Sequence, residues 1–129
     1  MQVVKERIRT VRNKEGRRET CKEQLRRICK SIADEITSGK TERLSKYKSK
    51  CEVILEAGCF MEGVYDIRYL VDSSKRFLGA ELLVAGGGPT IWVDTFREQV
   101  TGWWGTDRVQ WYYQDNIGLN DYMEEMYGC

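Results

Sequence analysis

Apolar residues recur every three or four positions in the first part of the chain, a spacing that predicts amphipathic helices. The clearest row consists of Cys21, Leu25, Ile28, Ile32 and Ile36. At its start, Thr20 and Glu23 match a capping box, in which each side chain satisfies the other's backbone N–H. At its end, Gly39 favours a helix stop. We therefore expect a helix between Thr20 and Gly39.

Two further helices are predicted on rows of the same spacing. Residues 4–16 carry Val4, Ile8 and Val11 inside a strongly basic segment. Residues 41–58 begin with Thr41, which can cap a helix, and end with Gly58. The apolar row of this third helix consists of Leu44, Tyr47, Cys51, Ile54 and Leu55.

After Gly63 the apolar residues alternate with polar ones, which is typical of strands with one solvent-facing side. Strands are predicted over residues 65–71, 77–84, 90–95, 100–104 and 109–113. The links between them are short, whereas parallel pairing needs crossovers of about a dozen residues or more, so we expect an antiparallel meander. Asn120 or Asp121 is then expected to cap a short acidic helix that ends at Gly128.

These elements predict a single α+β domain with basic N-terminal helices, an antiparallel sheet of about five strands and a short C-terminal helix. A chain of 129 residues is long enough to bury such a core. The basic helical part covers residues 1–58, the sheet covers residues 64–114 and the acidic helix covers residues 119–128.

The glycine run Gly86-Gly87-Gly88-Pro89 raises the question of a phosphate-binding loop. Such loops open a helix, and a P-loop also supplies a lysine followed by serine or threonine. Here the next residues are Thr90-Ile91-Trp92-Val93-Asp94, whose β-branched and aromatic side chains favour a strand. The run is therefore interpreted as a hairpin connection, with Trp92 and Asp94 on one face of the sheet and Ile91 and Val93 on the other.

Charge is distributed unevenly along the chain, although the net charge is only +1. Residues 1–50 contain 16 basic and 7 acidic residues, a net charge of +9, and residues 51–129 carry −8. This asymmetry favours contact between the basic half and a polyanion, although the two halves can also neutralise each other within one fold. The residues assigned to nucleic-acid or partner binding are Arg7, Arg9, Arg12, Arg17, Arg18, Lys22, Arg26, Arg27, Lys30, Arg43, Lys46 and Lys50.

Aromatic residues concentrate on the third to fifth predicted strands. Trp92, Trp103, Trp104 and Trp111 are candidates for contact with a partner, either a protein groove or unpaired bases. Alternation puts Trp103 and Trp104 on opposite faces of the sheet, and it puts Tyr112 opposite Trp111. The alternative is that most of these rings pack in the core.

Catalytic groups are scarce, so we expect no enzymatic activity, no catalytic residues, no cofactor and no metal site. The sequence contains no histidine and no CxxC spacing. The remaining candidates are Cys59 as a thiol nucleophile and carboxylate pairs formed by Asp94 with Asp107, or by Glu81 with either of them.

The compartment is expected to be the cytoplasm. The chain has no apolar run of about 20 residues and no signal-peptide pattern at its start. Its five cysteines are an odd number, and we expect reduced thiols. Cys21, Cys29 and Cys51 fall on apolar helix faces, where they are expected to be buried.

The segment GAELLVAGGGPTIWVDT, together with GWWG and DNIGLNDYMEEMYG, resembles small accessory proteins of phages and conjugative elements. The resemblance covers residues 79–128. That class includes anti-CRISPR and anti-restriction inhibitors, which are compact, non-enzymatic proteins directed at nucleic-acid machinery. The resemblance implies a class of role and assigns no residue.

We therefore expect a non-enzymatic protein of a mobile element that inhibits a host nucleic-acid-targeting complex. It would dock its basic helices on phosphates, or its acidic end on a basic protein groove; no membrane contact is expected, and the oligomeric state stays open. The acidic candidates are Asp107, Asp115, Asp121, Glu124 and Glu125. The first alternative is a free DNA- or RNA-binding regulator, and the second is a small enzyme that uses Cys59 or paired carboxylates.

Overall fold

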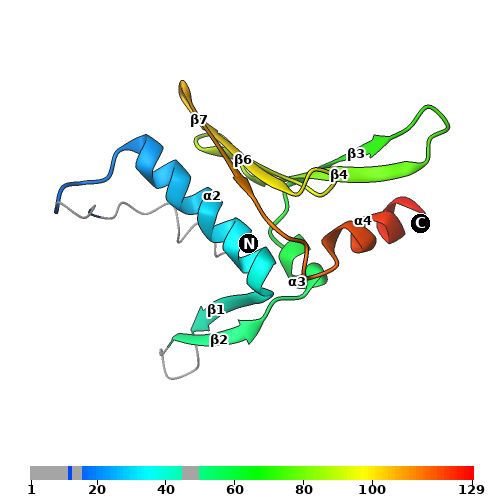
Figure 1. The fold of residues 1–129 in the computed structure, drawn as a ribbon, viewed down its shortest axis with the longest axis horizontal. Coiled ribbons are helices and arrows are strands. Elements are labelled where there is room, and N and C mark those ends of the chain that lie inside the picture. Colours follow the sequence, from blue (N-terminus) through cyan, green and yellow to red (C-terminus); the bar gives the residue numbers. More distant parts are fainter. Residues whose placement is uncertain (1–11, 13–15, 45–49) are drawn as a thin grey trace.

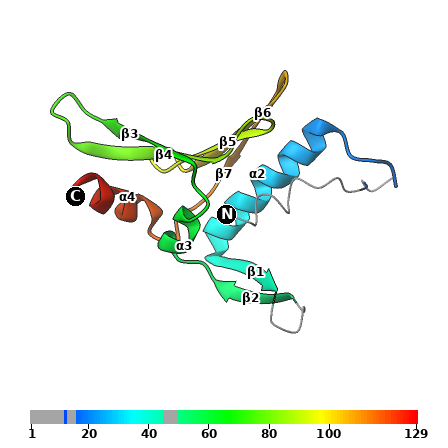
Figure 2. The ribbon, with the colours of Figure 1, turned by 180° about the vertical axis from the view of Figure 1, so that it is seen from behind.

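The computed structural model describes residue 12, residues 16–44 and residues 50–129. Within these ranges the chain is α+β, with a five-stranded antiparallel sheet, a two-stranded hairpin and three helices. Figures 1 and 2 show the helices and the hairpin on the same side of the large sheet. The predicted fold class is confirmed. The helix predicted over residues 4–16 falls almost entirely outside the described residues.

Helix α2 (Cys21–Ser38) forms as the apolar spacing predicts. The Thr20 hydroxyl accepts a hydrogen bond of 3.1 Å from the backbone N–H of Glu23. Gly39 ends the helix in the left-handed conformation, at φ 70°, and its N–H donates to the carbonyl of Glu35 at 2.8 Å. Glycine adopts this conformation without a steric penalty, so both ends of the helix are set by local residues.

The third predicted helix, over residues 41–58, is wrong. This segment forms an antiparallel hairpin of β1 (Lys40–Leu44) and β2 (Lys50–Ile54), followed by the short helix α3 (Ala57–Met61). The N–H of Leu55 donates to the carbonyl of Gly39 at 2.8 Å and closes the base of the hairpin.

Tertiary context explains this outcome. Helix α2 occupies the β6 and β7 part of the covered sheet face. Of the described side chains in the predicted apolar row, Cys51 is exposed and Ile54 is 79% exposed, and only Leu55, which follows the hairpin, joins the core. The β-branched residues Val53 and Ile54 also favour extended backbone. Thr41, the expected helix cap, is buried in β1 and its hydroxyl donates to the Glu35 carboxylate at 3.0 Å.

The large sheet is a meander in which each strand pairs with the next along the chain, in the order β3-β4-β5-β6-β7. Its strands are β3 (Asp66–Val71), β4 (Phe77–Ala85), β5 (Thr90–Asp94), β6 (Gln99–Trp104) and β7 (Asp107–Tyr112). All four pairings are antiparallel, as the short links predict.

The glycine run is the connection between β4 and β5. Gly87 and Gly88 have φ values of 93° and 140°, which side chains with a Cβ rarely adopt. Pro89 precedes the first residue of β5 and is buried. A strand follows the glycines, so the interpretation as a hairpin connection is confirmed.

One face of the sheet forms the core with α2. Leu25, Ile28 and Ile32 of α2 are buried, as are Val100 of β6 and Val109 of β7. Full burial of such side chains stabilises the fold by about 1.5–3 kcal/mol each.

Gly102 of β6 lies directly under α2. A Cβ at this position would come within 2.7 Å of both the Cys29 sulfur and the Leu25 side chain. Only the missing side chain allows the helix to lie this close to the strand.

Two of the three cysteines expected on apolar faces are exposed. Cys29 is buried in the core as predicted, but Cys21 and Cys51 are exposed. Cys21 is the first residue of α2, one turn before Leu25, where the buried row begins. Cys51 belongs to the β1–β2 hairpin, so the helical face that was expected to bury it does not exist.

Helix α4 (Leu119–Tyr127) packs beneath β4 and starts slightly earlier than predicted. Gly118 is its first flanking residue, and the Asp115 carboxylate accepts hydrogen bonds from the N–H groups of Leu119 and Asn120. Asn120 is therefore not the cap. Its side-chain oxygen accepts a hydrogen bond of 2.7 Å from the Thr95 hydroxyl.

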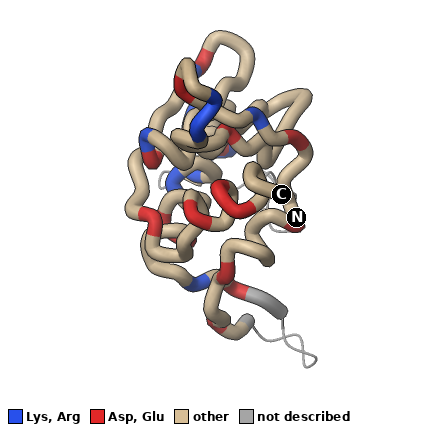
Figure 3. Tube along the Cα trace, turned by 90° about the vertical axis from the view of Figure 1, so that its right-hand side faces the viewer, with Lys and Arg blue, Asp and Glu red and all other residues tan. Residues whose placement is uncertain are grey.

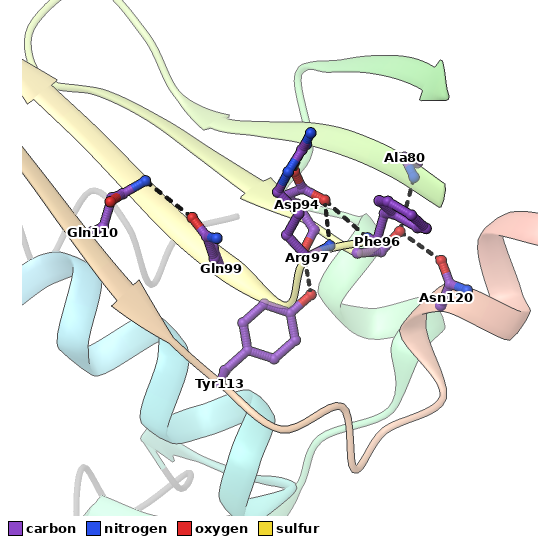
Figure 4. A network of polar contacts seen from close by, with 9 residues as sticks. Ala80, Asp94, Phe96, Arg97, Gln99, Gln110, Tyr113 and Asn120 are labelled. Carbon is purple, nitrogen blue, oxygen red and sulfur yellow. Dashed lines mark hydrogen bonds and ion pairs between the residues drawn. The ribbon is translucent and has the colours of Figure 1, made fainter. Parts of the chain in front are cut away.

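The Thr95 hydroxyl joins three segments of the chain (Figure 4). It accepts a hydrogen bond of 2.8 Å from the N–H of Ala80 on β4 while it donates to Asn120 on α4. Thr95 itself follows β5 and is buried. One hydroxyl thus positions α4 against the sheet.

Candidate functional site

The exposed side of α2 carries a row of basic residues. Lys22, Arg26 and Lys30 are exposed and spaced four residues apart, so they lie on one side of the helix. We call these three residues the basic ridge. The buried apolar row of α2, from Leu25 to Ile36, lies next to this side of the helix.

The ridge ends beside β7. The Lys30 ammonium lies 5.9 Å from the centre of the Trp111 ring, a cation–π contact, and also pairs with Asp34 at 3.0 Å. Trp111 lies on the α2 side of the sheet, packed against the core. The Lys30 end of the basic ridge therefore lies at the β7 edge of the sheet.

Arg27 does not belong to the ridge, although it was assigned to binding. Its guanidinium donates to the Glu19 carboxylate, with a shortest distance of 2.8 Å, and the Glu19 side chain is only 7% exposed. A half-buried ion pair of this kind fixes the segment before α2 onto the helix. Its loss would leave a buried carboxylate unpaired, which is strongly unfavourable.

The other predicted basic residues are dispersed. Arg17 and Arg18 are exposed before α2, and the Arg12 guanidinium donates to the carbonyl of Gly16 at 2.7 Å. Arg43 and Lys50 belong to β1 and β2 instead of a helix, so they do not extend the α2 row. Arg7, Arg9 and Lys46 lie outside the described residues.

No described helix or strand lies on the other face of the sheet (Figures 1 and 2). We call it the open face. Trp103 is 39% exposed there, whereas its neighbour Trp104 points to the opposite side and packs against the core. Likewise Tyr112 is 70% exposed and Tyr113 is buried. The predicted alternation of these aromatic residues is confirmed.

Four open-face side chains of β6 and β7 form a group that we call the aromatic patch: Trp103, Arg108, Gln110 and Tyr112. Trp103 pairs with Arg108 across the strands, and the Arg108 guanidinium lies 5.7 Å from the Trp103 ring centre. Gln110 donates to the side-chain oxygen of Gln99 at 3.0 Å (Figure 4).

Trp92 also lies on the open face, but its ring is partly covered. The Arg68 guanidinium of β3 lies 4.5 Å from the ring centre, reaching over β4. Ile91 and Val93 are fully buried on the other face, so the orientation predicted for this strand is confirmed. Of the four tryptophans predicted to contact a partner, only Trp103 is exposed. Trp92 is half-buried, and Trp104 and Trp111 pack against the core.

Sequence reasoning did not assign Arg68, Arg108 or Tyr112 to the site. Alternation along residues 107–113 gives the side on which Arg108 and Tyr112 lie, because Val109 between them is apolar. No local signal gives the contact between Arg68 and Trp92, since the two residues belong to different strands that are not neighbours.

The carboxylates proposed for catalysis are only partly brought together. Glu81 and Asp94 are direct cross-strand partners on the open face, but Asp107 pairs with Trp104 and lies on the opposite side of the sheet. Pairs that include Asp107 are therefore not formed. Asp94 also accepts hydrogen bonds from the N–H groups of Phe96 and Arg97 and pairs with the Arg97 guanidinium at 3.1 Å.

The thiols differ in their surroundings. Burial raises the pKa of the Cys29 thiol to about 12, so it stays protonated at neutral pH and is a poor nucleophile. Cys59 is half-buried on α3. Within the part of the chain that the structure describes, no group of three or more Cys, Asp or Glu side chains is arranged to hold a metal ion.

The acidic candidates form a smaller surface than predicted. Asp121, Glu124 and Glu125 are exposed on α4, and Figure 3 shows acidic positions along this helix. Asp115 is occupied as the cap of α4, and Asp107 lies on β7. The acidic surface is therefore confined to one short helix.

None of the described helices is long and apolar enough to cross a membrane. Comparison of the chain with protein-family models, curated proteins and solved structures gives no match.

Proposed function

We propose that this protein is a non-enzymatic binding protein that contacts nucleic-acid phosphates through the basic ridge. The observation that carries the proposal is the exposed row of Lys22, Arg26 and Lys30 beside the edge of the sheet. Lysine supplies a point charge and arginine supplies a planar fork, both suited to phosphate oxygens. Contacts of this kind give affinity that falls with salt and little choice of sequence.

The biological role we propose is inhibition of a host nucleic-acid-targeting complex by a protein of a mobile element. The resemblance of residues 79–128 to accessory proteins of phages and conjugative elements supports this role. In such a complex the ridge would cover guide or target phosphates. The acidic surface of α4 offers the opposite mode, in which carboxylates would occupy a basic groove of the complex.

Charge reversal tests the ridge. Arg26→Glu should weaken binding to a nuclease ribonucleoprotein, or to bare nucleic acid, by about tenfold or more at low salt, because an attraction becomes a repulsion. The double variant Lys22→Glu/Arg26→Glu should also reduce the slope of log affinity against log salt by about 2 for duplex DNA. Lys75→Glu, at an exposed turn between β3 and β4, is the matched control and should bind normally.

The second candidate is a free DNA- or RNA-binding regulator, which the same ridge favours. A gel shift with bare DNA and RNA separates the two roles. Tight, salt-sensitive binding without a partner protein supports the regulator, whereas binding only to the assembled ribonucleoprotein supports the inhibitor. If the wild-type protein bound neither at low salt, or if Arg26→Glu bound normally, the assignment of the ridge would be overturned.

A further inference from the structure

The basic ridge and the aromatic patch meet at the same strand. Trp111 of β7 contacts Lys30 on the α2 side, and its neighbours Gln110 and Tyr112 point to the open face. At Lys30 the two surfaces are therefore separated by the thickness of one edge strand. A ligand that follows the ridge can pass around this edge and reach the patch.

The chemistry of the patch suits the faces of planar rings. Trp103 and Tyr112 expose 39% and 70% of their surface, and Thr101 and Gln110 lie between them in the strand register. Arg108 is the one charged side chain that the described residues of β6 and β7 place on the open face, and it is positive. The acidic residues Glu81 and Asp94 belong to β4 and β5.

The spacing of the patch favours a flexible ligand. Arg108 is the cross-strand partner of Trp103, and Tyr112 lies four residues beyond Arg108 on β7. The positions of Trp103 and Tyr112 are therefore about 14 Å apart along the strands. A duplex keeps its bases stacked inside and presents phosphates to such a surface. A single strand can turn individual bases outward and stack them on separated aromatic rings.

A second copy of the chain fits this surface poorly. Two copies that met at their β7 edges or patches would bring Arg108 and two basic ridges close together, and like charges at short distance repel. A polyanion instead gains attraction from the same charges. Charge complementarity thus favours nucleic acid over self-association.

We propose that the aromatic patch stacks unpaired bases, so that the ligand of the basic ridge is a single-stranded nucleic acid. This inference rests on the proposed function, because it names the ligand class of a phosphate-binding ridge. Phosphates are held by Lys22 and Arg26 on one side of β7, and bases are held by Trp103 and Tyr112 on the other.

The test compares a labelled oligouridine or oligothymidine strand with a duplex of equal length, by fluorescence anisotropy at low salt. Wild-type protein should bind the single strand more tightly. Trp103→Thr and Tyr112→Thr should each weaken single-strand binding by about tenfold and leave duplex binding unchanged. Trp103→Phe keeps a ring for stacking and should retain most of the affinity. Tyr65→Thr, at an exposed tyrosine next to β3, is the matched control and should bind normally.

The outcomes separate the two proposals. If Arg26→Glu weakens binding but the single strand and the duplex bind equally, and Trp103→Thr has no effect, the inference about unpaired bases is overturned and the ridge stands. If wild-type protein binds no nucleic acid, alone or in a ribonucleoprotein, both proposals fall. Thermal unfolding of each variant shows that the comparison is made on folded protein. If Trp103→Phe lost as much affinity as Trp103→Thr, the loss would not come from stacking and the inference would also be overturned.

Discussion

The two faces of the five-stranded sheet differ in composition, and the difference separates stability from binding. The face covered by α2 and α4 is predominantly apolar: Leu82, Ile91 and Val100 are fully buried, and Trp104 and Trp111 pack against the core. The open face carries arginine, glutamine and aromatic side chains, several of them exposed. Successive side chains along each strand point to opposite faces, so neighbouring residues contribute in turn to the core and to the surface available for binding.

The largest expected effect comes from adjacent leucines on β4. Leu82 is fully buried and Leu83 is half-buried on the open face. Leu82→Ala should reduce the free energy of unfolding by about 2–5 kcal/mol, because it leaves a cavity in the core. Leu83→Ala should cost less than half of that amount. Urea denaturation of both variants measures the difference, and equal losses would contradict the division between the faces.

The next largest loss of stability is expected when a glycine under α2 is replaced by alanine. Gly102→Ala should cost about 1–3 kcal/mol, because its Cβ would come within 2.7 Å of Cys29 and Leu25. Gly86→Ala is the control, since its Cβ would lie no closer than 3.7 Å to Leu83. The same denaturation measurement applies, and a neutral Gly102→Ala would mean that α2 can move away from β6 without loss.

The loss of a polar group should also cost more stability on the covered face than on the open face. Thr95→Val removes a buried hydroxyl that bonds to Ala80 and Asn120, and we expect a loss of about 1–3 kcal/mol. Thr95→Ser keeps both bonds and should recover most of the loss. Gln110→Ala breaks an exposed bond to Gln99 and should change stability by less than about 0.5 kcal/mol. A larger effect of Gln110→Ala would assign a structural role to the open face.

The last expected effect is a pH dependence, which is negligible at neutral pH. The pKa of Cys29 is raised by burial from 9.0 to about 12, so the folded state keeps the proton after the unfolded state has lost it. Below pH 9 the thiol is protonated in both states and does not change the free energy of unfolding with pH. As the pH rises from 9 toward 12, the free energy of unfolding falls by up to about 1.4 kcal/mol per pH unit. Between about pH 9 and 10 the unfolded thiol is still only partly ionised, so unfolding of wild type should show a loss of about 1 kcal/mol from this group. Cys29→Ala should remove it, whereas Cys21→Ala should not.

Local residues were sufficient to predict most of the fold. The capping box at Thr20 and the glycine at position 39 mark the ends of α2, and the alternation of apolar residues locates all five strands of the meander. The helix predicted over residues 41–58 was wrong because helical spacing alone does not show which of its apolar residues reach the core. Ile54 is exposed and Leu55 is buried, a difference that depends on where α2 lies. The start of α4 was misplaced because Asn120 bonds to Thr95, which is 25 positions away.

The sequence was sufficient to name most residues of the candidate site, but not to predict which of them lie together. Charge counting identified Lys22, Arg26 and Lys30, which form the ridge. It also included Arg27, whose partner Glu19 could be recognised only in three dimensions. Alternation correctly placed Trp103 on the open face, but the shielding of Trp92 by Arg68 depends on strand order.

The packing of α2 on the last two strands has a consequence for synthesis of the protein. The helix ends at Ser38, while its partners β6 and β7 end at Trp104 and Tyr112. A ribosome adds about 5–20 residues per second, so the apolar side of α2 leaves the exit tunnel several seconds before the surface that covers it exists. During that interval the nascent chain exposes Leu25, Ile28, Ile32 and Ile36, an apolar surface that is prone to aggregation until the final hairpin emerges.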